Sequence, residues 1–354
     1  MKLFSKKSKS SVGLDIGSSL IKIVEIDHSK DLPTLTKYGV IKLPPEAIVE
    51  GEIMDRSLVI EGIQECMAKA NIEKKDVISA VSGRAVIVKK VVMDKMNPDD
   101  AKEAIFWEAE QHVPFDIDDV CLDFEVLKED VGANQMEILL VAAKKEMVNT
   151  HAELIRDAGF EPVIIDVDSF AVQNAYGMSV GEVWAGVTGL INIGSDVTNI
   201  NIVQDNIPLF TRDLSIGSSM FIEALQREMG ASFEEAEMMI SGESDVEDDG
   251  EKVRTIIADT CEDLSMGIER SVSFLKTAGD AEQLDEVVLS GGGARIPWLQ
   301  EILGEKHNIE FKLNSSVSSI QQDGDLMSNT VDELDKVAPL LTVSLGLALR
   351  REDD

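Results

Sequence analysis

The chain has 354 residues, 44% apolar and 28% charged, which is the balance of a globular protein with a buried core. One core seldom serves a chain of this length, so we expect at least two lobes. The 66 acidic residues outnumber the 33 basic ones and give a formal charge of -33, which argues against a nucleic-acid-binding surface because such binding relies on neutralising phosphates.

Cysteines and histidines are few and scattered, and none of them lies at the spacing of a metal site. No apolar run approaches the roughly 20 residues of a membrane span, and no signal peptide precedes the first predicted strand. We therefore expect a protein of the reducing cytoplasm with neither a zinc site nor a catalytic histidine. The basic residues 1–9 are interpreted as a frayed terminus, the alternative being a weak contact with an anionic membrane.

The first predicted element is a β-hairpin over residues 12–26. An apolar strand reaches Asp15, the chain turns through Gly17, Ser18 and Ser19, and a second apolar strand follows. Glycine lets a ligand approach the backbone, and consecutive amides with two hydroxyls can hold an anion such as phosphate. Taken alone, the pattern fits an ordinary hairpin turn equally well.

Lys22 lies inside the apolar second strand of this hairpin, between Ile21 and Ile23. A buried ammonium is costly unless an anion accompanies it, so we interpret Lys22 as a further phosphate ligand. The alternative places Lys22 on a solvated strand edge.

Strands and helices follow in an order that predicts one α/β lobe interrupted by a small unit at residues 85–160. Pro98 and the acidic residues after it suit the beginning of a helix. The expected strands are residues 34–43, 76–82, 86–93, 120–127, 136–143 and 160–166, and the expected helices are residues 56–70, 98–112, 145–158 and 169–176.

A second hairpin, residues 189–200, repeats the first. Asp15 aligns with Asn192, Gly17 with Gly194, and Ser18 with Ser195. Two copies far apart in one chain predict a duplicated fold whose two phosphate hairpins face one cleft.

The second lobe is expected to continue with strands at residues 206–214 and 285–290. Ser232 and Glu235 have the spacing of a helix capping box, and residues 251–278 form the most regular helical pattern in the chain. Helices are also expected at residues 217–228, from Pro297 onward and at 337–349, and loops at residues 244–251 and 321–330.

Three consecutive glycines, Gly291, Gly292 and Gly293, stand between a buried strand and a helix. They permit near-contact with a flat ligand, and a helix N-terminus favours anions. The alternative is a flexible turn.

Together, the two hairpins and the glycine triplet resemble the phosphate 1, phosphate 2 and adenosine motifs of the actin, Hsp70 and sugar-kinase superfamily. An inserted small domain in the first lobe is characteristic of the cell-division protein FtsA and of the type IV pilus assembly protein PilM. Residues 101–115, Ala-Lys-Glu-Ala-Ile-Phe-Trp-Glu-Ala-Glu-Gln-His-Val-Pro-Phe, and residues 338–350 are similar to the PilM family.

The resemblance implies a two-lobed actin-like (ribonuclease H-like) α/β fold with a small inserted α+β domain in the first lobe. The expected divisions are a first lobe at residues 1–84 and 161–188, the inserted domain at 85–160, a second lobe at 189–218 and 263–336 with its small subdomain at 219–262, and a C-terminal helix at 337–354 that returns to the first lobe.

The resemblance also implies a site for ATP and Mg²⁺. Asp15 would lie near Mg²⁺, directly or through water, and Glu237 would contact the ribose. The residues expected to hold the phosphates are Gly17, Ser18, Ser19, Lys22, Asn192, Gly194, Ser195 and Thr198, and those expected to line the adenosine are Gly291, Gly292, Gly293 and Arg295.

Two positions depart from the pattern of these relatives. Asn192 stands where they have Asp, so the charge that binds Mg²⁺-water is missing. Ile240 stands where they have Lys in Ala-Glu-x-x-Lys, so we expect no cation beside the nucleotide. We infer nucleotide binding with weak or absent hydrolysis. No catalytic residue is assigned, because Asp166 and Asp168 fit a structural role equally well.

The expected function is that of a nucleotide-gated scaffold, cytoplasmic and peripheral at the inner membrane. By resemblance to PilM it would bind the cytoplasmic N-terminus of PilN, an inner-membrane pilus protein, between the inserted domain and the first lobe. The alternatives are a small-molecule kinase on the same fold and an FtsA-like polymerising protein. The kinase would need a general base and a specificity pocket, which the sequence does not show.

Overall fold

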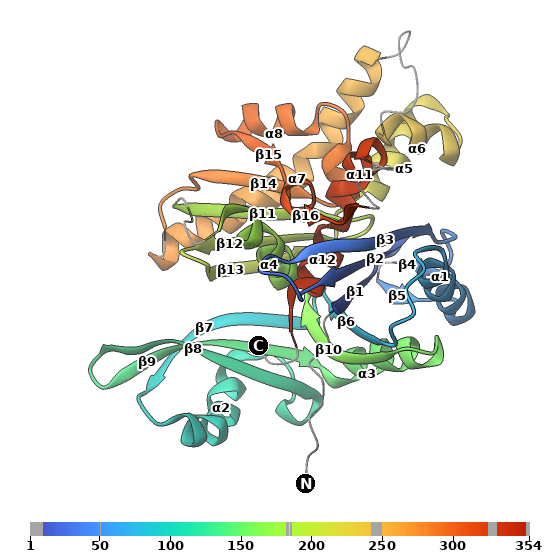
Figure 1. The fold of residues 1–354 in the computed structure, drawn as a ribbon. Coiled ribbons are helices and arrows are strands. Elements are labelled where there is room, and N and C mark those ends of the chain that lie inside the picture. Colours follow the sequence, from blue (N-terminus) through green and yellow to red (C-terminus); the bar gives the residue numbers. More distant parts are fainter. Residues whose placement is uncertain are drawn as a thin grey trace.

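The computed structural model describes residues 10–49, 51–181, 184, 186–241, 250–279, 281–324 and 331–351. Two sheet-based lobes lie one above the other, and a smaller unit built on a third sheet lies below the first lobe (Figure 1). No helix in these ranges is long and apolar enough to cross a membrane.

The sheet of the first lobe has six strands in the order β10-β6-β1-β2-β3-β16. The first three strands of the chain pair antiparallel, and β6 and β10 continue the sheet in parallel with β1. The strands are β1 (Ser10–Ile16), β2 (Leu20–Asp27), β3 (Thr34–Lys42), β6 (Asp76–Val81), β10 (Glu161–Val167) and β16 (Gln321–Gln322).

The second lobe repeats this arrangement in five strands, ordered β13-β12-β11-β14-β15. Again a three-stranded antiparallel meander is followed by two parallel strands. The duplication predicted from the two hairpins is therefore confirmed. The strands are β11 (Val187–Ile193), β12 (Thr198–Gln204), β13 (Ile207–Leu214), β14 (Glu286–Ser290) and β15 (Phe311–Leu313).

Helices α4 (Asp168–Val180) and α12 (Thr342–Leu349) lie between the two sheets (Figure 1). They share a core with Ile78 of the first lobe and Leu190 of the second. The two helices cross so closely that a Cβ at Gly346 would lie 1.7 Å from the carbonyl oxygen of Ala171. This pair of helices is thus the packed joint between the lobes.

The other helices of the second lobe cover its sheet and share one core with it. Ser232 and Glu235 form the predicted capping box, since each backbone N–H donates to the other side chain. The helices are α5 (Ser218–Met229), α6 (Phe233–Ser241), α7 (Gly250–Ala278) and α8 (Leu299–His307). The shorter α9 (Ser316–Ser319) and α11 (Val331–Val337) instead share a core with β2 and β3 of the first lobe.

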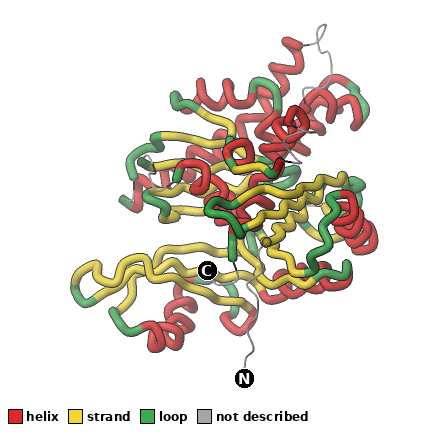
Figure 2. Tube along the Cα trace, in the orientation of Figure 1, coloured by secondary structure: helices red, strands yellow, loops and turns green. Residues whose placement is uncertain are grey.

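The inserted unit has a three-stranded sheet, ordered β7-β9-β8, with its own core. Figure 2 shows these strands as a layer of their own, with a helix on the side away from the lobes. Its elements are β7 (Val86–Asp94), α2 (Pro98–His112), β8 (Val120–Gly132) and β9 (Gln135–Lys144).

The following helix, α3 (Lys145–Asp157), packs elsewhere than expected. It buries Leu154 and Ile155 in the core of the first lobe, together with residues of α1 (Arg56–Lys69). The expected inserted domain ran to residue 160. We now propose that it ends near Lys144, because the apolar face of α3 is covered by the first lobe.

Three further expectations need correction. Helix α8 begins at Leu299 and not at Pro297, because Trp298 has a left-handed backbone with φ of 61°. The expected helix at 337–349 is a 3₁₀ turn, Ala338–Leu341, followed by α12. The expected loop at 321–330 begins with β16, which pairs with β3, and residues 325–330 of it lie outside the described residues, as do 242–249 of the acidic region and the basic residues 1–9.

Candidate functional site

The first hairpin turn is closed by a hydrogen bond from the N–H of Gly17 to the carbonyl of Leu20, at 3.0 Å. Ser18 and Ser19 form the tip of the turn and are partly exposed. Asp15 and Lys22 lie opposite each other just below it, and their charged groups are 2.8 Å apart. The anion that a half-buried Lys22 requires is therefore supplied by Asp15 of the same hairpin.

The second hairpin turn has the same closure, from the N–H of Gly194 to the carbonyl of Val197 at 2.9 Å. The first residues of α5 stabilise this turn, because the N–H of Ser218 donates to the carbonyl of Gly194 and the N–H of Ser219 to the carbonyl of Ser195. The carbonyls of this turn are thus engaged by the protein, and its side chains remain partly exposed.

Below this turn, Asn192 and Asn199 occupy the places of Asp15 and Lys22. The amide of Asn192 donates to Asn199 at 3.0 Å and accepts from Ser290 at 3.4 Å. The hydroxyl of Thr198 is fully buried and donates to the carbonyl of Ile216 at 2.7 Å. In this structure the hydroxyl of Thr198 faces the protein interior, and its expected contact with phosphate stays a prediction.

Two acids that were not assigned to the site join it in the structure. Asp168 begins α4, and burial together with the Asp15 carboxylate raises the pKa of Asp168 to about 7. Asp213 of β13 accepts from Asn199 at 2.8 Å and from the N–H of Gly83 in the first lobe. Burial also raises the pKa of Asp213. Asp15, Asp168 and Asp213 therefore form a cluster of three acids between the lobes, in which Lys22 pairs with Asp15.

Asp166, the other acid considered in the sequence, has a structural place. Its carboxylate lies 3.4 Å from Arg350 at the end of α12, and its other oxygen accepts from the N–H of Val167. It links β10 to the C-terminal helix.

The glycine triplet packs against the second hairpin. The N–H of Gly291 donates to Pro339 at 2.9 Å, and Gly291 has φ of 83°. A Cβ at Gly293 would lie 2.2 Å from the Cγ2 atom of Ile193. Protein packing thus explains two of the three glycines. At Gly292 a Cβ would meet only the end of the Leu340 side chain, at 3.3 Å, a tight contact with a group that can move.

Arg295 and Glu237 lie at the same end of the second lobe. Arg295 ends the 3₁₀ turn that begins at Gly292 and is partly exposed. Helix α6, which carries Glu237, packs against this turn through Ala236. Glu237 forms an ion pair with Lys42 of β3 in the first lobe. Glu237 thus has a cation from another part of the chain, and the expectation that no cation lies beside the nucleotide stays a prediction.

The two turns and the acids between the lobes suit a ligand that is a polyanion bound together with a hard cation. Carboxylates are the ligands that Mg²⁺ prefers, and Mg²⁺ commonly uses one or two of them together with phosphates and water. Within the described residues, no three carboxylate, imidazole or thiol groups are close enough to form a metal site by themselves. Asp15 thus fits a Mg²⁺ that arrives with a nucleotide, and within the described residues these acids do not form a complete cage.

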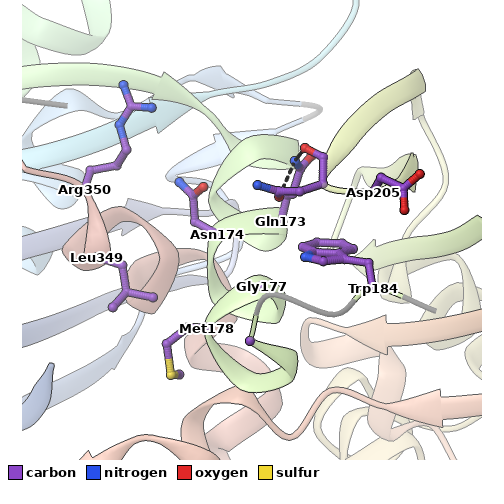
Figure 3. Close-up of a pocket in the computed structure, with 10 residues that line it drawn as sticks. Gln173, Asn174, Gly177, Met178, Trp184, Asp205, Leu349 and Arg350 are labelled. Carbon is purple, nitrogen blue, oxygen red and sulfur yellow. Dashed lines mark hydrogen bonds between the residues drawn. The ribbon is translucent and has the colours of Figure 1, made fainter. Parts of the chain in front are cut away.

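A separate cavity of about 550 Å³ lies toward the other end of α4. Figure 3 shows Gln173 and Asn174 on α4, with Arg350 on one side and Trp184 and Asp205 on the other. Gln173 is bound to Asn206, its neighbour on the second lobe, at 2.9 and 3.1 Å. None of the residues predicted to bind nucleotide lines this cavity.

The model of the family described as type IV pilus assembly protein PilM matches residues 13–352. The chain belongs to this family. Among solved structures, it is similar to a chain of a PilM-PilN type IV pilus biogenesis complex, with 27% identity and a TM-score of 0.84 over 97% of this chain and 98% of that one.

More distant structures show the fold alone. The ethanolamine utilization protein EutJ from Carboxydothermus hydrogenoformans is 16% identical, with a TM-score of 0.57 over 97% of this chain and 90% of that one. MreB 5 of Spiroplasma citri bound to AMPPNP is 10% identical, with a TM-score of 0.54 over 96% and 95%. The predicted two-lobed actin-like fold is confirmed.

Proposed function

We propose that the chain is an ATP-binding scaffold of the type IV pilus assembly platform that binds the cytoplasmic N-terminus of a PilN-like protein. The observation that carries this proposal is the likeness, over 97% of the chain, to a protein solved in a PilM-PilN complex. The scaffold would act in the cytoplasm and reach the inner membrane through its partner.

Nucleotide binding is supported by the geometry between the lobes. Two turns with partly exposed serines lie near Lys22 and the acids between the lobes, and the second lobe adds the glycine turn and Glu237. The proposed phosphate ligands are Gly17, Ser18, Ser19, Lys22, Asn192, Gly194 and Ser195, the proposed nucleoside ligands are Gly291, Gly292, Gly293, Arg295 and Glu237, and Asp15 is proposed near Mg²⁺. When bound, Mg²⁺ would offset the charge of the phosphates beside the three acids.

We expect hydrolysis to be weak or absent, because Asn192 brings no charge for Mg²⁺-bound water and is occupied by Asn199. One observation favours a slow ATPase as a second candidate. Asp168, with a pKa of about 7, exchanges its proton in the range that suits a general base. An Asp168→Asn variant that releases phosphate as fast as the wild type would remove this candidate.

The partner proposal is tested with a synthetic peptide that carries the N-terminal sequence of a PilN protein. We expect the peptide to bind the full chain with and without Mg·ATP, and a scrambled peptide of the same composition not to bind. If the peptide fails to bind in both conditions, the scaffold function is contradicted.

A further inference from the structure

Lys42 is the last residue of β3 and lies beside the first hairpin turn. It pairs with Leu20 in the register of β2 and β3. The N–H of the next residue, Leu43, donates to the carbonyl of Ser19 at 2.8 Å. The backbone of Lys42 is therefore fixed next to one of the proposed phosphate ligands.

The side chain of Lys42 reaches the opposite lobe. Its ammonium pairs with the carboxylate of Glu237 on α6 and lies 5.8 Å from the ring centre of Phe233 on the same helix. Lys42 is 52% exposed and Glu237 is 36% exposed. The pair thus bridges the two lobes at their solvent-exposed edge.

This bridge explains the departure at Ile240. In the relatives that the sequence resembles, a Lys one helical turn after the acid supplies the cation. Here Ile240 is 8% exposed and belongs to the core of the second lobe. A cation at that position would be buried, and Lys42 supplies one from outside α6.

The pair contributes little to the stability of the fold. Exposed ion pairs contribute little to stability, because water screens the charges and both side chains lose freedom. A cation that joins the phosphate turn of one lobe to the ribose acid of the other is better explained by a role toward a ligand.

We propose that Lys42 is a positioning residue for the nucleoside, which holds the carboxylate of Glu237 toward the ribose hydroxyls. The proposal rests on the ATP-binding function proposed above. Because Lys42 and Glu237 belong to different lobes, their contact requires the lobes to be close, so a nucleotide held by Glu237 and the ion pair stabilise the same arrangement.

The test is a binding cycle with two ligands, ATP and 2′,3′-dideoxy-ATP, measured by calorimetry with Mg²⁺. The wild type should prefer ATP by at least about tenfold, since dideoxy-ATP lacks the ribose hydroxyls that would donate to the carboxylate of Glu237. Lys42→Met should weaken ATP binding by roughly fivefold and change dideoxy-ATP binding less than twofold. Lys42→Arg should stay close to wild type because it keeps the cation.

Lys37→Met is the matched control. Lys37 lies on the same strand and also forms an ion pair, with Glu25 at 3.4 Å, but away from α6. It should bind both ligands as the wild type does. Equal losses for ATP and dideoxy-ATP in Lys42→Met, or no loss for either, would overturn the positioning role. Failure of the wild type to bind ATP would overturn the ATP-binding function itself and with it this proposal.

Discussion

Asp15 and Lys22 face each other across the β1–β2 hairpin, with 2.8 Å between carboxylate and ammonium. The corresponding residues of the duplicated hairpin, Asn192 and Asn199, make the same cross-strand contact with neutral amides at 3.0 Å. The cross-strand contact therefore has the same geometry in both hairpins, but only the first hairpin makes it with charged side chains. This asymmetry places the phosphate-binding cation on one side of the proposed nucleotide site.

We predict that Asn192→Asp destabilises the protein in the absence of nucleotide by about 1–2 kcal/mol. A carboxylate cannot donate to Asn199, whose own amide group is engaged by Asp213 at 2.8 Å, and it adds a charge near a buried acid. Urea unfolding at pH 8 measures the difference. Asn192→Asp with wild-type stability would show that the donated hydrogen bond is dispensable.

A second prediction follows from the raised pKa of Asp168, about 7. Its pKa in the unfolded chain is near 3.8, so between these values the native state holds a proton that unfolding releases. The cost to stability therefore builds up as the pH rises from about 4 to about 7 and is fully present above that. Asp168→Asn removes this cost. We expect the variant to be more stable than wild type at pH 8 by about 1–2 kcal/mol, a value reduced for partial exposure to water.

The advantage of Asp168→Asn should shrink as the pH falls from 8 to 5, because wild-type Asp168 becomes protonated. Urea titrations of both proteins at these two pH values provide the measurement. A difference in stability that is the same at both would mean that Asp168 ionises like a solvent-exposed carboxyl.

We expect the glycines of the turn at residues 291–293 to have different roles, Gly293 in protein packing and Gly292 in ligand binding. Gly293→Ala would place a Cβ 2.2 Å from Ile193, so we expect a loss of about 1–3 kcal/mol in stability. Gly292→Ala would place its Cβ 3.3 Å from the end of the flexible Leu340 side chain, which can move aside, so we expect a stability loss below about 1 kcal/mol. ATP affinity should fall at least about tenfold because the methyl group enters the proposed nucleoside space. Unchanged ATP binding in Gly292→Ala would separate this turn from the nucleotide.

The joint between the lobes depends on the close crossing at Gly346. Gly346→Ala should cost at least about 3 kcal/mol or prevent folding, because its Cβ would overlap the backbone of Ala171 at 1.7 Å. Gly250→Ala is the control, since nothing lies within 4 Å of its Cβ position. Thermal unfolding of both variants is the measurement, and we expect only Gly346→Ala to lower the unfolding midpoint.

The hairpins and the capping box were predictable because their signals are local. A glycine turn between apolar strands fixes a hairpin, and Ser232 with Glu235 fixes the start of α6. Their duplication also predicted the two matching sheets. Turn residues and hydrophobic periodicity were therefore enough to predict most of the fold.

The missed features depend on contacts between distant residues. The packing of α3 on the first lobe follows from a core that its own sequence does not reveal. Lys42 and Asp213 look like ordinary surface and strand-end residues until Glu237, Asn199 and Gly83 are brought to them. The position of Asp168, directly after a buried strand and at the start of a helix, was the available signal for the acid cluster.

The central claim is that the cleft binds Mg·ATP through the first hairpin. Calorimetry of the wild type and of Lys22→Met, with phosphate release followed in the same samples, tests it most directly. We predict binding to the wild type with negligible turnover, and at least about tenfold weaker binding to Lys22→Met because the phosphates lose their cation. Absence of ATP binding by the wild type, or equal binding by both proteins, would contradict the claim.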